Sequence, residues 1–221
     1  MALDEAAMSD TGDGIERERR RAEHALTRLE AFSDGVFAIA ATLLVLDLAV
    51  SELGQVSTDA GLWDALVELT PGFVAFVVSF LLLCLLWWLH VRTVEAMVRV
   101  DRVFVALNSL RLLGVVLIPF TTSINSTFTE LDTGAVYLAV NFGAVVIVGT
   151  AQTWYATAPG RGMTELTARE ARAVRRDGLA AVLLATAALL LSPFVGSLAF
   201  LVFALDLLVS RWLRRGLPPR L

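Results

Sequence analysis

The sequence predicts an all-α integral membrane protein with six transmembrane helices. Its 221 residues are 57% hydrophobic with a mean hydropathy of +0.70, whereas soluble domains are about 45–50% apolar. The apolar residues gather in five stretches that are long enough, or nearly so, to cross a hydrocarbon core about 30 Å thick. All 18 basic residues are arginines, and all but Arg111 gather near the two termini and on alternate connections between these stretches. Hydropathy, stretch length and arginine placement together indicate this fold class.

The five apolar stretches predict the transmembrane helices in order. They run near residues 32–50, 69–91, 102–126, 133–156 and 178–212. One crossing takes roughly 20 apolar residues, so the last stretch is too long for a single helix. Ser192-Pro193 lies near its middle, where proline cannot donate to the helical hydrogen-bond ladder. We therefore expect a helical hairpin there, and hence six helices within residues 31–212.

The arginines also predict the orientation in the membrane. They cluster before the first stretch, between the second and third, between the fourth and fifth, and after the last. The other connections carry acids and no arginine, for example Asp59 and Glu130. Because arginine is enriched on the cytoplasmic side, we expect both termini in the cytoplasm, which requires an even number of crossings. Residues 1–30 are then a cytoplasmic N-terminal segment and residues 213–221 a cytoplasmic tail.

The first stretch opens on a polar signature, Arg28 followed by Phe32-Ser33-Asp34. On a helix that turns 100° per residue, one stripe consists of Phe32, Gly35, Ile39, Leu43 and Leu46. Thr42 lies on the flank of this stripe and Asp34 points away from it. The apolar side chains can form rings around a path, or they can simply pack against another helix, as in any buried amphipathic helix.

Polar residues at the arginine-rich ends of the first three stretches are predicted to lie at one depth. This cluster comprises Arg28, Ser33, Asp34, Trp87, His90, Asp101 and Asn108. Ionisable groups within a span are costly, so each is a candidate functional group. The cluster can be a clamp that satisfies buried polar groups, or it can be a relay for protons or ions.

Arg111 lies about 9 residues, or roughly 14 Å, into the third stretch at 1.5 Å per residue. A charge at that depth needs a partner, and Asp206 on the last stretch is the nearest acid in depth. We therefore expect an ion pair between them. A short cytoplasmic helix is expected near residues 164–177, where Thr167 and Glu170 have capping-box spacing.

The residues at the start of the first stretch form the motif Arg28-x-x-x-Phe32-Ser33-Asp34-x-x-x-Ala38-Ile39. This motif resembles the first-helix signature of the transmembrane protein 175 family of potassium channels. Further matching positions are Trp87-x-x-His90, Asp101, Asn108 and Pro119-Phe120. The resemblance covers roughly Arg28 to Phe120; beyond it, only the number and length of the spans agree. Arg111 departs from the pattern.

The resemblance implies that single six-helix units assemble as a homotetramer, with the first helix of each subunit lining a central pore. The stacked hydrophobic layers of that pore would be Ile39, Leu43 and Leu46, with Ile39 the tightest. Thr42 would form a hydroxyl ring that bears on cation selectivity. The residues that would hold the cytoplasmic helix ends together are Arg28, Asp34, Trp87 and His90. The implied function is a potassium-permeable cation channel in a bacterial plasma membrane.

The main alternative function is a proton-coupled secondary transporter, because transporters also place acids and histidines in the membrane. The paired broken helices and internal repeats common in transporters are not visible in the sequence. An enzyme is not expected, since neither a nucleophile elbow nor a His-Glu-x-x-His motif occurs. The expected partners are the lipid bilayer, further copies of the chain and potassium ions. Nucleic acid, a cofactor and any metal beyond transient potassium are not expected.

Overall fold

The computed structural model describes residues 2–48, 56–128, 131–200 and 202–203. In chain order the elements are α1 (Ala2–Leu43), η1 (Leu44–Asp47), α2 (Asp59–Glu68), α3 (Thr70–Glu95), α4 (Arg102–Thr127), α5 (Asp132–Ala156), α6 (Ala168–Val195) and η3 (Gly196–Phe200). Of the described helices, five are long and apolar enough to cross a membrane, namely α1 over Glu16–Leu46, α3, α4, α5 and α6. The all-α membrane fold is therefore confirmed. The sixth predicted span lies largely outside the described residues.

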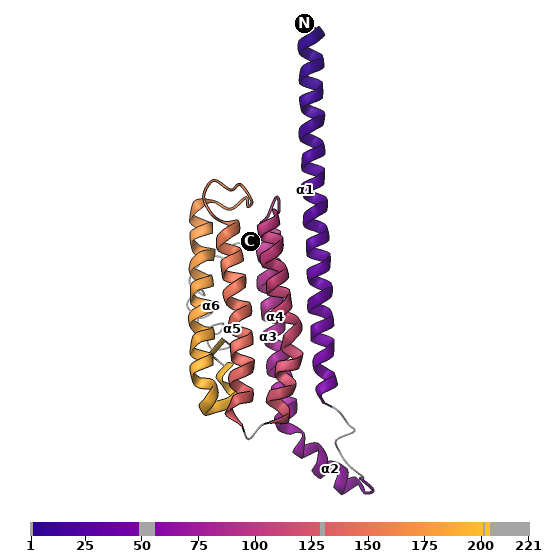
Figure 1. The fold of residues 1–221 in the computed structure, drawn as a ribbon. Helices are drawn as coiled ribbons and strands as arrows, with labels where there is room; N and C mark the ends of the chain where they lie inside the picture. The colour runs from indigo at the N-terminus through magenta and orange to yellow at the C-terminus, as the bar shows by residue number, and fades with distance from the viewer. Residues whose placement is uncertain (1, 49–55, 129–130, 201, 204–221) are drawn as a thin grey trace, which may run out of the picture.

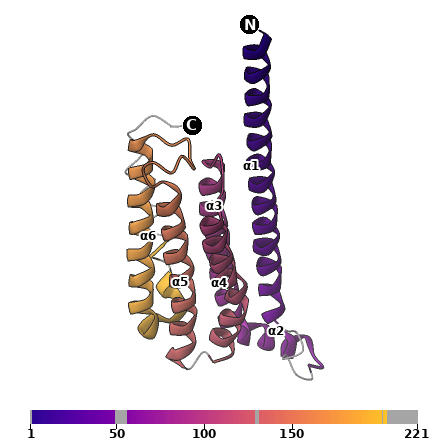
Figure 2. The ribbon, with the colours of Figure 1, turned by 45° about the horizontal axis from the view of Figure 1, so that its top comes forward.

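The membrane helices run side by side and alternate in direction (Figure 1). α1 lies along one edge of the bundle and packs against α4 and α3, whereas α6 forms the opposite edge beyond α5 (Figures 1 and 2). The α3–α4 and α5–α6 connections meet at one end, where Arg99 Nε donates to Gly162 O (3.1 Å) and Val98 N to Met163 O (2.9 Å). The two described connections that carry arginines thus lie together. They are at the end of the bundle beyond which the N-terminal part of α1 projects.

Helices α4 and α5 approach closely because glycine occupies two contact points between them. A Cβ atom on Gly114 would lie 2.5 Å from Val145 Cγ2, and one on Gly134 would lie 3.0 Å from Asn125 Cα. Small residues at such points let two membrane helices pack backbone to backbone. Leu138 and Phe142 of α5 fill the adjacent core, and the ring of Phe200 from η3 packs edge-on against Phe142.

α1 is continuous from Ala2 to Leu43, so one helix includes both the expected N-terminal segment, residues 1–30, and the first membrane stretch. Two elements differ from the sequence-based expectation. The expected short helix at 164–177 is instead the first turns of α6. Its capping box is present, with Thr167 Oγ1 accepting from Glu170 N (3.3 Å) and Thr167 N donating to Glu170 Oε2 (2.9 Å). The amphipathic helix α2, capped by Thr58, was not predicted.

The expected break at Ser192-Pro193 is wrong by about one turn. α6 continues through Pro193 to Val195 and ends where Gly196 adopts a φ of 57°. Proline cannot bond the carbonyl four residues earlier, which is Leu189 O, but Ser192 Oγ donates to this carbonyl at 2.8 Å. Serine and threonine side chains compensate for proline within membrane helices in this way. The serine therefore lets the helix pass the proline.

Candidate functional site

One face of α1 is buried in the bundle. Its residues, each at most 8% exposed, are Leu29, Ser33, Phe37, Ala40 and, in η1, Leu44. They recur every three or four positions and therefore form a single stripe on the helix. This stripe faces α4 and α3, the two helices against which α1 packs. The packing fixes the rotation of α1 about its own axis.

The described residues leave the opposite face of α1 uncovered. Its exposed residues are Phe32, Gly35, Ile39, Thr42, Leu43 and, in η1, Leu46. Ile39 is 62% exposed, Leu43 41% and Leu46 69%. The sequence left open whether this stripe packs inside the subunit, and the described residues do not pack against it. Among the described residues, this face is therefore the side of α1 that is available to further contacts.

Thr42 is the polar residue in the middle of this open face. Its hydroxyl donates to the carbonyl oxygen of Ile39 at 2.9 Å. The hydroxyl proton is thereby used inside the helix, while the oxygen keeps its lone pairs as acceptors. A cation is attracted by such an oxygen, and an anion is not.

Two adjacent residues of α1 attach it to two different helices. Trp87 Nε1 of α3 donates to Asp34 Oδ1 at 2.8 Å. Asn108 Nδ2 of α4 donates to Ser33 Oγ at 3.0 Å, and Ser33 Oγ donates to Leu29 O at 2.8 Å. Ser33 and Asn108 are almost completely buried. The structure thus brings together four of the predicted polar residues as two cross-links.

Gln152 of α5 extends the second cross-link. Its Nε2 donates to Asn108 Oδ1 at 3.2 Å, so buried hydrogen bonds join α1, α4 and α5. Gln152 is fully buried, and its Oε1 has no hydrogen-bond partner among the described residues. Gln152 was not predicted from the sequence, because the candidate residues within the spans were chosen mainly as ionisable groups. The signal was present: Gln152 is an amide in an apolar helix, at the end that also carries the polar cluster.

His90 does not join the other members of the polar cluster in which it was expected. It is buried on α3, where its Nδ1 lies 3.2 Å from an Arg111 NH1 nitrogen of α4. Because a guanidinium can only donate, Nδ1 is the acceptor and the imidazole proton is on Nε2. The second Arg111 amine donates to Leu86 O at 3.0 Å. Asp206, the expected partner of Arg111, lies outside the described residues.

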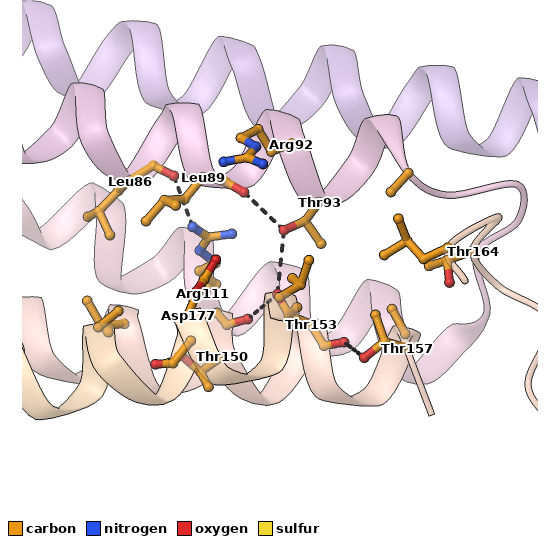
Figure 3. A pocket seen from close by; sticks show the side chains of 18 residues that line it. Leu86, Leu89, Arg92, Thr93, Arg111, Thr150, Thr153, Thr157, Thr164 and Asp177 are labelled. Atoms are coloured by element: carbon orange, nitrogen blue, oxygen red, sulfur yellow. Dashed lines mark hydrogen bonds between the residues drawn. The ribbon is translucent and has the colours of Figure 1, made fainter. Parts of the chain in front are cut away.

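A cavity of about 200 Å³ adjoins Arg111 between α3, α5 and α6. Figure 3 shows hydroxyl side chains around it, and Thr93 Oγ1 of α3 lies 3.5 Å from Thr153 Oγ1 of α5. Arg111 fits beside α5 because position 149 is glycine, where a Cβ would come within 3.0 Å of its Nε. No described residue of α1 lines this cavity. It belongs to the subunit interior and is separate from the open face of α1.

Asp101 and Arg28 do not join the α1 cross-links. Asp101 caps α4 by accepting from Phe104 N (2.8 Å), and it accepts from Tyr155 Oη (2.6 Å). Partial desolvation raises the pKa of Asp101, but the Tyr155 and backbone hydrogen bonds and the charge of Arg161, 3.9 Å away, outweigh it, so the pKa lies below its ordinary 3.8. Arg28 is exposed and bonds to no other described residue. The members of the expected single cluster are therefore divided among four separate groups, namely the two α1 cross-links, the His90–Arg111 contact and the Asp101–Tyr155 contact, and Arg28 is exposed.

Comparison with known proteins places this arrangement in a family. Residues 28–119 match the family model described as the endosomal/lysosomal potassium channel TMEM175. The chain is similar to the crystal structure of a lysosomal potassium-selective channel TMEM175 homolog from Chamaesiphon minutus, at 30% identity and a TM-score of 0.70. That match covers 86% of this chain and 98% of the other. The chain belongs to the TMEM175 family.

Two curated proteins show how far the similarity extends. A potassium channel of Streptomyces collinus is 38% identical over 120 residues, which are 54% of this chain and 57% of that protein. An endosomal/lysosomal proton channel TMEM175 of Gallus gallus is 36% identical over 109 residues, 47% of this chain and 22% of that protein. The matches therefore span 57% of the Streptomyces collinus protein and 22% of the Gallus gallus protein, which is only part of the length of each.

The TMEM175 family model covers both cross-links of α1 but not the whole polar network. Asp34, Trp87, Ser33 and Asn108 all lie within residues 28–119. Gln152 lies beyond the match, on α5. The described residues contain no group of three or more His, Cys, Asp or Glu that could hold a metal ion. The polar contacts described above join the helices of this TMEM175 protein, and the described residues leave one face of α1, with Ile39 and Thr42, exposed.

Proposed function

We propose that this chain forms a potassium-permeable cation channel whose pore is lined by α1 from several copies. The observation that carries the proposal is the open face of α1, an apolar stripe interrupted by one hydroxyl. Within one chain α1 stands at the edge of the bundle, so a path along this face has to lie between copies (Figure 1). The similarity to proteins named as potassium channels supports the same function.

The proposed assembly is a homotetramer. Helices are about 10–12 Å across with their side chains, so four α1 helices around one axis leave a path that large side chains can close. Ile39, Leu43 and Leu46 then form three apolar layers, with two steps of about 6 Å each along the axis, because Leu46 lies in the 3-10 helix η1, which rises about 2.0 Å per residue. Apolar rings exclude ions by dewetting, and a small outward movement restores conduction. We propose Ile39 as the tightest layer.

Selectivity is proposed to arise from Thr42 and from the width of the pore. The sequence contains no Thr-Val-Gly-Tyr-Gly filter of the kind that replaces the hydration shell with backbone carbonyls. The Thr42 hydroxyl proton is bonded to Ile39 O, so the oxygen offers lone pairs to a passing cation. Hydroxyl dipoles in a side-chain pore should select less strongly than carbonyl rings. We expect a potassium-over-sodium permeability ratio below about a hundredfold.

The cross-links of α1 are proposed to act as a clamp and not as a proton relay. The Ser33–Asn108–Gln152 chain contains hydroxyl and amide groups, none of which changes charge at physiological pH. Asp34 is held by Trp87, whose indole only donates. Arg28 is exposed at the same end, where it can reach a neighbouring subunit. We also propose that this arginine-rich end faces the cytoplasm of a bacterial cell and that the channel lies in the plasma membrane.

The test is a flux assay on purified protein in potassium-loaded liposomes. Ile39→Asn and Leu43→Ala should raise flux or relax selectivity, because they wet or widen the apolar layers. Ile147→Asn and Ile147→Ala are the matched controls, since Ile147 is 55% exposed on α5, away from α1. Equal effects at positions 39, 43 and 147, or no gradient dissipation by the parent protein, would contradict the proposal.

The same assay addresses the proton-coupled transporter. The comparisons do not favour it, because the matching relatives are named as channels. A channel should dissipate a potassium gradient without a coupled ion, whereas a transporter should show saturable, strictly proton-coupled uptake. A pH-sensitive dye inside the liposomes also measures proton permeation, the activity named for the Gallus gallus relative.

A further inference from the structure

Three arginines form one outward face on the first turns of α6. Arg169, Arg172 and Arg176 are spaced by three and four residues, so they share a side of the helix, and all three are exposed. They border a hollow of about 420 Å³ that is also lined by Glu170 and Ala173. Within the described part of the chain, none of the three arginines makes an ion pair or a side-chain hydrogen bond. Their charges therefore remain available to a partner.

The neighbouring charged residues have structural roles that set them apart. Glu170 closes the capping box, where its Oε2 accepts from Thr167 N and Thr167 Oγ1. Arg175 points toward α5 and donates to Thr157 Oγ1 (2.9 Å) and to Thr157 O. The face formed by Arg169, Arg172 and Arg176 is thus not needed for the helix start or for packing against α5.

An apolar stripe continues directly below these arginines on the same side of α6. Leu179, Leu183, Leu190 and Phe194 follow Arg176 at helical spacing and are 47%, 71%, 67% and 83% exposed. Residues 178–195 contain no charged side chain and span about 27 Å, close to a hydrocarbon core of about 30 Å. Arg176 consequently falls at the boundary of the hydrocarbon, and the other two arginines fall at headgroup depth.

We propose that this face binds an anionic phospholipid, with the headgroup phosphate against Arg169, Arg172 and Arg176 and an acyl chain along Leu179 and Leu183. The occupant is a lipid because charge and apolarity are arranged along the membrane normal in the order in which a phospholipid presents them. α6 also stands at the edge of the bundle away from α1, so a pore around α1 leaves this face toward the bilayer (Figures 1 and 2). Arginine pairs with phosphate oxygens through two parallel hydrogen bonds.

The binding experiment uses the full chain in detergent, titrated with phosphatidylglycerol or phosphatidylcholine and followed by native mass spectrometry. An arginine near an anionic lipid surface strengthens binding by about fivefold. The triple variant Arg169→Gln, Arg172→Gln, Arg176→Gln should therefore lose roughly a hundredfold in phosphatidylglycerol affinity and keep its phosphatidylcholine affinity. Replacing the same three residues by lysine should keep most of the affinity, because lysine also binds phosphate as a point charge.

The matched control is Arg19→Gln, Arg20→Gln, Arg21→Gln, which removes three exposed charges from the part of α1 that projects beyond the bundle. It should bind phosphatidylglycerol as the parent does. Equal losses in the two triple variants would mean general charge attraction and would overturn the proposal, as would parental affinity in the α6 variant. A changed oligomeric state of the α6 variant would instead assign this face to a second copy, and this too overturns it. If the triple variant does not fold, Arg172→Gln alone should lose about fivefold.

Discussion

Trp87 Nε1 lies 2.8 Å from Asp34 Oδ1, and this hydrogen bond joins α3 to α1 one residue away from the bond that joins α4 to Ser33. Two successive side chains of α1 therefore hold two different helices. Successive residues of a helix are 100° apart, so this pair fixes rotation as well as height. Rotation matters because it decides that Ile39 and Thr42 face outward.

Loss of the Asp34–Trp87 bond should loosen α1. We expect Trp87→Phe and Asp34→Ala each to lower the stability of the folded chain, and their combination to cost no more than the larger single change. The coupling should be about 1 kcal/mol, the net value of one hydrogen bond between partly exposed groups. Thermal unfolding in detergent measures it. Trp88→Phe is the control, because the Trp88 ring contacts Arg92 instead, with Arg92 Cζ 4.9 Å from the ring centroid. Strictly additive losses from the Asp34 and Trp87 changes would rule out the coupling.

Gly149 should be required for the position of Arg111. Gly149→Ala places a methyl group 3.0 Å from Arg111 Nε and 3.2 Å from its Cζ, so the guanidinium must shift away from His90 and Leu86. We expect a loss of about 1–3 kcal/mol, the cost of leaving buried polar groups unsatisfied. Gly143→Ala on the same helix is the control, since nothing lies within 4 Å of its Cβ. That control should be neutral or slightly stabilising, and equal losses in the two variants would contradict the role of Gly149.

Ser192 should matter only because residue 193 is proline. Ser192→Ala removes the donor to Leu189 O and should cost about 1 kcal/mol in the native background. With Pro193→Ala already in place, the new backbone N–H takes that carbonyl, so the same serine change should cost much less. Unfolding midpoints of the four proteins give the comparison. An identical serine effect in both backgrounds would disprove this compensation.

Acid should remove the stabilising contribution of Asp101. Its folded pKa lies below the ordinary 3.8, so the ionised carboxylate stabilises the fold above that value and the effect is lost as the pH falls through the folded pKa. Tyr155→Phe removes one of the hydrogen bonds that lower this pKa. The difference in Tm between parent and variant should therefore be largest near neutral pH. It should disappear as the pH falls below about 3.8. A difference that does not change with pH would exclude Asp101 as its source.

Sequence periodicity predicted the two faces of α1 because burial on a helix follows a simple repeat. Ser33 and Ile39 lie on opposite sides, as 100° per residue requires. Depth along the membrane also predicted which polar residues share a level. The first bonds from Asp34 and Ser33 therefore reach Trp87 and Asn108, both of which the sequence had singled out, whereas Gln152, which extends the second cross-link, was not predicted.

The partners of His90 and Arg111 could not be predicted in the same way. Depth gives the level of a side chain in the bilayer but not the direction in which it points, and several acceptors share that level. Arg111 is bonded by a backbone carbonyl and an imidazole, neither of which carries a negative charge that a search for ion pairs would find. The helix break at Pro193 was predicted wrongly for a related reason. The backbone hydrogen bond that Pro193 cannot make is replaced by one from the side chain of Ser192, and the position of proline alone does not reveal this.

The uncovered stripe of α1 also has a consequence for biogenesis. In the proposed assembly, a newly inserted subunit exposes Ile39, Leu43 and Leu46 to acyl chains until it meets other copies, so these side chains must tolerate a hydrocarbon environment before they line a pore. Polar substitutions here act twice, once on the insertion of the lone subunit and once on the assembled protein. Reduced amounts of such variants in the membrane would therefore reflect the cost of the unassembled state, and activity has to be expressed per assembled complex.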